Sequence, residues 1–86
     1  MTSLNKFKDL SKRFSKVFDR LETSSNGYKT KDNKYSFGIM VDSNDKLFIA
    51  VYHTDFNKLI NCGNPKEIWD DIPEVIQKEL IFYLDM

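Results

Sequence analysis

Apolar residues near the start of the chain recur with the period of an α-helix. Between residues 4 and 21 they stand three or four positions apart, so a helix of about five turns would carry them on one side. They are Leu4, Phe7, Leu10, Phe14, Val17, Phe18 and Leu21. Ser3 can serve as the N-cap, and small polar residues followed by Gly27 favour the end of the helix. We therefore expect a helix over residues 4–21 with one apolar side.

After Gly27 the apolar residues alternate with smaller or polar ones, which is the pattern of a β-strand. This alternation predicts strands over residues 34–42 and 46–53, and the polar, turn-forming residues 42–45 predict that the two pair as a hairpin. A shorter strand around residues 28–30, with a turn at Asp32-Asn33, would add an antiparallel edge strand. Residues 58–61 are a weaker candidate for a fourth strand.

Two helix-start signals follow. Asn64-Pro65-Lys66-Glu67 and Asp71-Ile72-Pro73-Glu74 each combine a capping residue, a proline and a glutamate. They predict a short helix that carries Ile68 and Trp69 and a second helix that runs to residue 86.

The order helix, three or four strands, helix predicts an α+β fold, a two-layer sandwich in which helices lie on an antiparallel meander. A chain of 86 residues can bury one core, so we expect residues 1–86 to form a single domain. The apolar side of the first helix should rest on one face of the two long strands. That face is formed by Phe37, Ile39, Val41, Leu47, Ile49 and Val51.

The other face of the sheet would carry Met40, Phe48, Ala50 and Tyr52, with Tyr28 nearby. If both helices cover the same face, these side chains are exposed, as is typical of an interface. If the helices lie on opposite faces, or if the C-terminal helix wraps under the sheet, they are buried. The sequence pattern leaves both arrangements open.

The net charge is zero, yet the charges are unevenly distributed. Residues 1–38 hold nine Lys or Arg against four Asp or Glu, and residues 39–86 hold four against nine. Basic residues follow the first helix and could contact phosphates, although a charged helix side is usually only solvated. These candidates for nucleic-acid binding are Lys6, Lys8, Lys12, Arg13, Lys16 and Arg20.

Candidates for chemistry are few. His53, Asp55 and Cys62 could in principle form a thiol, imidazole and carboxylate arrangement, but nothing near Cys62 predicts a rigid oxyanion hole. One His and one Cys do not make a zinc site, and residues 42–53 lack the glycine and the glutamate of a calcium loop. The sequence also has no glycine-rich phosphate loop. We therefore expect no enzyme, no metal, no cofactor and no small-molecule substrate.

Cys62 is the only cysteine, which fits a reducing compartment, and no apolar run is long enough to cross a membrane. We expect a cytoplasmic protein that is not attached to a membrane. The abundance of Lys, Asn, Ile, Phe and Tyr is typical of A+T-rich coding sequence, which suggests a phage or mobile-element origin.

The hypothesis that fits these features is a small non-enzymatic module that binds another protein, or a second copy of itself as a homodimer. As a phage-like accessory protein, it would inhibit or adapt a host protein. The alternative is nucleic-acid binding by the first helix. The expected protein-binding surface is acidic and aromatic and consists of Phe48, Tyr52, Trp69, Asp70, Asp71 and Glu74.

Overall fold

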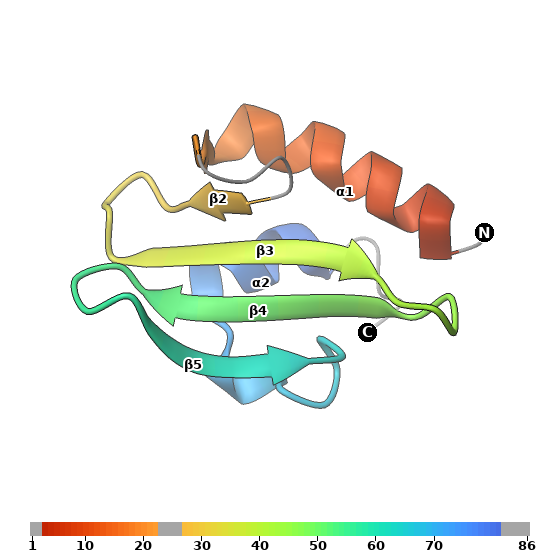
Figure 1. Ribbon diagram of the computed structural model, residues 1–86. Helices are drawn as coiled ribbons and strands as arrows, with labels where there is room; N and C mark the ends of the chain where they lie inside the picture. Colours follow the sequence, from red (N-terminus) through yellow and green to blue (C-terminus); the bar gives the residue numbers. More distant parts are fainter. Residues whose placement is uncertain (1–2, 23–26, 82–86) are drawn as a thin grey trace.

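In a computed structural model that describes residues 3–22 and 27–81, five strands form one antiparallel sheet in the order β1-β2-β3-β4-β5 (Figure 1). Each strand pairs with the next along the chain, so the sheet is a meander. The elements are α1 (Ser3–Val17), β1 (Asp19–Arg20), β2 (Gly27–Lys29), β3 (Tyr35–Val41), β4 (Leu47–His53), β5 (Lys58–Gly63), the 3-10 helix η1 (Trp69–Asp71) and α2 (Glu74–Leu80). The predicted α+β arrangement is confirmed, with more strands than expected.

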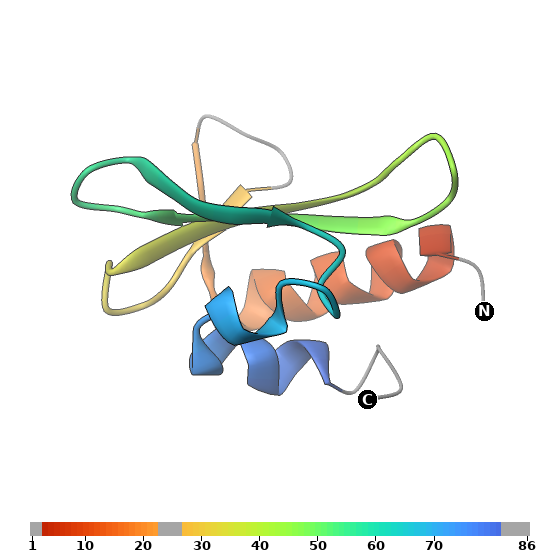
Figure 2. The same ribbon diagram turned by 90° about the horizontal axis from the view of Figure 1, so that it is seen from below.

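Both helices lie on the same face of the sheet. Seen edge-on in Figure 2, α1, η1 and α2 are all on one side of the strands. The described residues therefore make two layers, and the helices leave the second face of the sheet uncovered. Of the arrangements that the sequence allowed, this is the one with an open sheet face.

The core fills the space between α1, α2 and the covered face of the sheet. Phe14 of α1 is fully buried, and its ring makes edge-to-face contacts with Phe37 of β3 and Tyr28 of β2 at centroid distances of 5.2 and 5.6 Å. From α2, Ile76 and Leu80 are buried as well. The predicted strand residues form the floor of this core: Phe37, Ile39, Leu47, Ile49 and Val51 are buried, and Val41 is partly buried.

The first helix ends earlier than its apolar pattern predicts. The N–H of Phe18 still donates to the carbonyl of Phe14, but residues 19–20 form β1, which pairs with β2. Leu21 then donates its N–H to the carbonyl of Gly27. Backbone groups that would have continued the helix are satisfied by a neighbouring strand instead, so the prediction of helix over residues 18–21 was wrong.

Tyr28 also differs from expectation. It is opposite Phe37 in the β2–β3 register, so its side chain points into the core and is only 1% exposed. Its ring stacks on Phe37, and its hydroxyl donates to the carbonyl of Ser11 over 3.4 Å. Tyr28 therefore belongs to the covered face and not to the open one.

Aspartate side chains fix two of the hairpin turns, as the sequence predicts. One Asp42 carboxylate oxygen accepts hydrogen bonds from the N–H groups of Asn44 and Lys46. The Asp32 carboxylate accepts hydrogen bonds from the N–H of Lys34 and from the hydroxyl of Thr30, a buried residue. These bonds hold the pKa of Asp32 below its usual value, and the bond from Thr30 is the largest cause.

The chain after β4 follows the predicted order with different boundaries. β5 extends to Gly63, two residues beyond the candidate strand. Asn64 caps a turn, where its side chain accepts the N–H of Lys66, and the short helix that follows is the 3-10 helix η1. The N-cap of α2 is Pro73. The predicted continuation of this helix over residues 82–86 lies outside the described residues.

None of the helices in the described part of the chain is both long and apolar enough to cross a membrane.

Replacing Phe14 by alanine should lower the free energy of unfolding by about 3–5 kcal/mol, because a fully buried ring leaves a cavity. The matched control is Phe56→Ala, which removes a ring that is 80% exposed and should cost at most about 0.5 kcal/mol. Urea denaturation of both variants measures the difference. Equal losses would contradict the burial described above.

Replacing Asp32 by alanine should destabilise the protein at pH 7 and much less in acid. The lowered pKa of Asp32 means that this carboxylate contributes stability above the pKa of the unfolded chain, about 3.9. That contribution is lost as the pH falls through the lowered pKa that Asp32 has in the folded protein. Unfolding curves at pH 7 and pH 2.5 measure it, with Asp32→Asn, which keeps one acceptor oxygen and does not titrate, as the control. If Asp32→Ala lowered the free energy of unfolding equally at both pH values, the loss would not come from the charged carboxylate.

Candidate protein-binding surface

The open face of the sheet is built by alternate residues of three neighbouring strands. In the β3–β4 register, Met40 is opposite Phe48, and Gly38 is opposite Ala50. The β4–β5 register adds Cys62 beside Ala50. These residues lie on the face opposite to Phe37, Ile39 and Val51 because successive side chains of a strand point to opposite sides.

Two rows of larger side chains flank a row of small ones on this face. Met40 and Phe48 form the first row, which we call the Phe48 ridge. Tyr52 and Leu59, also register partners, form the second, the Tyr52 ridge, and Ser36 and Lys29 continue this second row across β3 and β2. The row between them crosses the strands and is formed by Gly27, Gly38, Ala50 and Cys62.

The row of small residues leaves a hollow of about 380 Å³ on the open face, which we call the groove. Its lining residues are Gly27, Phe37, Gly38, Ile39, Met40, Phe48, Ala50 and Tyr52. The lining is mainly apolar, so the groove suits an apolar side chain better than a charged ligand.

Apolar side chains of this face are strongly exposed. Met40 is 48% exposed and Leu59 is 46% exposed, while Phe48 and Tyr52 are partly buried between their neighbours. Phe56, in the turn between β4 and β5, is 80% exposed. Neither Leu59 nor Phe56 was predicted from the sequence as a surface residue. The available signal for Phe56 was an aromatic residue between the turn-forming residues Asp55 and Asn57.

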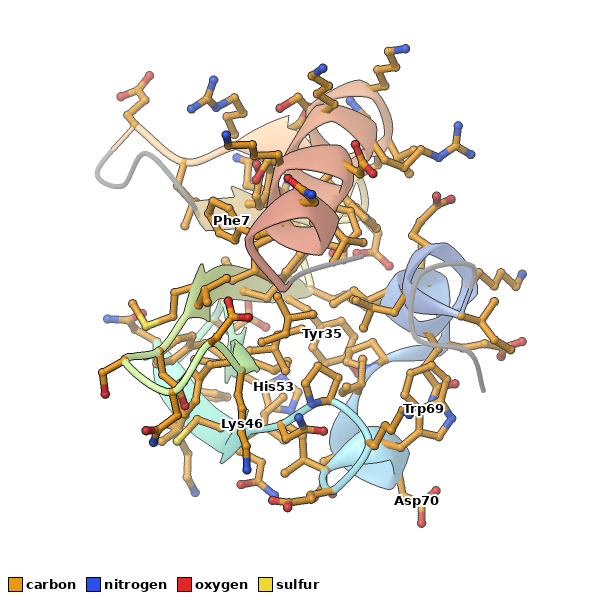
Figure 3. The ribbon with its side chains drawn as sticks, turned by 90° about the vertical axis from the view of Figure 1, so that its right-hand side faces the viewer. Phe7, Tyr35, Lys46, His53, Trp69 and Asp70 are labelled. Atoms are coloured by element: carbon orange, nitrogen blue, oxygen red, sulfur yellow. The ribbon has the colours of Figure 1, made fainter. Side chains whose placement is uncertain are left out.

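The other predicted protein-binding residues lie in the helical layer. Trp69 is partly buried against the core, and its carbonyl accepts a hydrogen bond from the side chain of Gln77. Asp70 is exposed and points away from the molecule in Figure 3. The Asp71 carboxylate accepts a hydrogen bond from the Asn61 side chain at 2.8 Å.

Glu74 is exposed and lines a second hollow together with Trp69. The structure therefore divides the six predicted residues between two surfaces. Phe48 and Tyr52 lie on the open face. Trp69, Asp70 and Asp71 form η1, and Glu74 is the first residue of α2.

The basic residues of the nucleic-acid alternative are also divided. Lys8, Lys12 and Lys16 are exposed and follow each other at four-residue spacing along one side of α1. The Arg13 guanidinium donates to the Glu79 carboxylate at 2.6 Å, which ties α1 to α2. Arg20 lies in β1, opposite Tyr28, and the side chain of Lys6 lies outside the described residues.

His53 and Cys62 are not placed to work together. The ring of His53 packs against Tyr35 at a centroid distance of 5.2 Å, at the end of β4. Cys62 is opposite Ala50, three residues back along the same strand, which corresponds to about 10 Å. That separation is beyond the hydrogen-bond reach that a nucleophile and its base need.

Within the described residues, no group of three His, Cys, Asp or Glu side chains could hold a metal ion.

Comparison with known proteins finds that no family model matches the chain, and that neither a curated protein nor a solved structure matches it.

Proposed function

We propose that this protein is a non-enzymatic module that binds another protein molecule, and that its binding surface is the open face of the sheet. The observation that carries the proposal is the exposure of apolar side chains on a sheet face from which both helices are absent. A soluble domain rarely exposes a contiguous apolar patch unless something covers it.

The energetics favour a protein partner. Burying a fully exposed large apolar side chain contributes roughly 1.5–3 kcal/mol. Met40 and Leu59 are about half exposed, so covering each would contribute roughly half of that and offset part of the cost of association. Phe48 and Tyr52 are of the aromatic kind that is enriched in interfaces, and Tyr in particular is frequent at hot spots. The groove between them would receive an apolar side chain of the partner.

Two finer parts of the proposal concern the location of the protein and its biological role. An exposed, unpaired Cys62 fits a reducing compartment, so we place the protein in the cytoplasm. The role of a phage or mobile-element accessory protein that inhibits or adapts a host protein rests on composition alone. Trp69, Asp70 and Glu74 would serve a separate contact, because they lie in the helical layer.

A photoreactive phenylalanine analogue at position 48 or 52 should form covalent adducts with a protein partner in cells, because both positions lie on the open face. The matched control places the same analogue at Lys12, which is exposed on α1. Mass spectrometry of the adducts identifies the partner and the site of attachment. Adducts from Lys12 but none from positions 48 and 52 would refute the open face as the binding surface.

The second candidate function is nucleic-acid binding by α1, which the spacing of Lys8, Lys12 and Lys16 favours. Gel shifts with a short duplex and with single-stranded RNA, at several salt concentrations, test it. Binding through three phosphates should weaken steeply with salt, and Lys12→Glu should weaken it further. Lys66→Glu is the control, since Lys66 lies outside α1. No shift at 50 mM salt would dismiss this candidate.

A further inference from the structure

We propose that the partner on the open face is a second copy of this chain, docked face to face with its strands antiparallel to those of the first. The Tyr52 ridge of each copy enters the groove of the other. The inference rests on the proposed function, because it names the partner of the same surface.

The relief of the open face is self-complementary. The Tyr52 ridge and the Ala50 row of the groove are two residues apart along β4, which corresponds to about 7 Å. A two-fold axis that runs between these rows, across the strands, exchanges them, so that each ridge faces the other copy's groove. Two packed sheets are about 10 Å apart, a gap that a tyrosine side chain entering from one sheet can fill.

The alternative two-fold axis, parallel to the strands, lacks this fit. It would place the Tyr52 ridge of one copy against the Tyr52 ridge of the other, and groove against groove. The apolar groove would then remain empty, and its lining would lose the dispersion contacts that a close-packed interface provides. Shape therefore selects the antiparallel arrangement.

Charge selects the same arrangement. The turn between β3 and β4, residues 42–46, has two aspartates against one lysine. The turns at the opposite end of the sheet, residues 30–34 and 54–58, together have three lysines against two aspartates. Antiparallel docking brings ends of opposite net charge together, and parallel docking brings like ends together. Such exposed charges add little affinity, but they orient the encounter.

The size of the face sets the strength of the association. An axis between the Ala50 row and the Tyr52 ridge overlaps only about five residues of each long strand, about 17 Å, and the sheet is about 20 Å wide, so the footprint is roughly 300–350 Å². A standard interface buries about 800 Å² on each partner. We therefore expect a reversible dimer whose population depends on concentration, in place of a permanent one.

Sedimentation velocity of the purified full chain over a range of concentrations, up to about 1 mM, tests the inference. The wild-type protein should pass reversibly from monomer to dimer. Tyr52→Lys, which places a charge on the ridge, should raise the dissociation constant at least tenfold. Lys12→Glu on α1 is the matched control and should leave it unchanged. Circular dichroism and thermal unfolding show whether each variant is folded.

A second variant separates a specific groove from a face that is merely adhesive. Ala50→Tyr adds apolar surface in a residue type that strands favour, but it fills the groove. Docking of ridge into groove predicts that this variant dimerises at least tenfold more weakly. Tighter association of Ala50→Tyr would overturn the ridge-and-groove arrangement, since an adhesive face gains from added apolar area.

The outcomes distinguish this inference from the proposed function. A wild-type protein that stays monomeric at every concentration overturns the dimer. If the photoreactive group at position 52 then attaches to a different protein, the open face remains a protein-binding surface with another occupant, such as an apolar helix side. If purified dimers cross-link through position 52 to the partner copy near Ala50, the inference is supported directly.

Discussion

The packing of Phe14 against the sheet is the contact on which the rest of the molecule depends. Its ring meets Phe18, Tyr28 and Phe37 edge-on, with centroid distances between 5.2 and 5.6 Å, so one side chain joins α1 to β2 and β3. A chain of this length can bury only one core. Because α2 adds Ile76 and Leu80 to that same core, no helix within residues 3–22 and 27–81 covers the sheet's other face.

The elements were largely predictable from the sequence because they depend on local periodicity and on turn chemistry. The alternation in β3 and β4 and the aspartates at residues 32 and 42 give the hairpins, since each signal acts within a few residues. The end of α1 at Val17 was not predictable in this way. Residues 19–20 leave the helix to pair with Tyr28 and Lys29 of β2. These partners follow later in the sequence, outside the apolar pattern that predicts the helix.

Only part of the candidate surface could be read from the sequence. Alternation alone places Phe48 and Tyr52 on the same face, but whether that face is open depends on where both helices pack. The groove depends on the register that aligns Gly27, Gly38 and Ala50 across three strands, which no local pattern specifies. Trp69 and Asp71 were expected at the same surface, yet they are held in the helical layer by contacts with the core and with Asn61.

The edges of the sheet are less suited to docking than its face. β1 has two residues, too few for a stable added strand. In β5 the N–H of Cys62 donates to the side chain of Asn61, whose amide in turn donates to Asp71, and a bulge interrupts the pairing with β4. Short edge strands, side-chain capping of backbone groups and bulges are devices that discourage edge pairing. Side chains on a face are therefore better suited to an association of this fold than either sheet edge, and Met40 and Leu59 are exposed on the uncovered face.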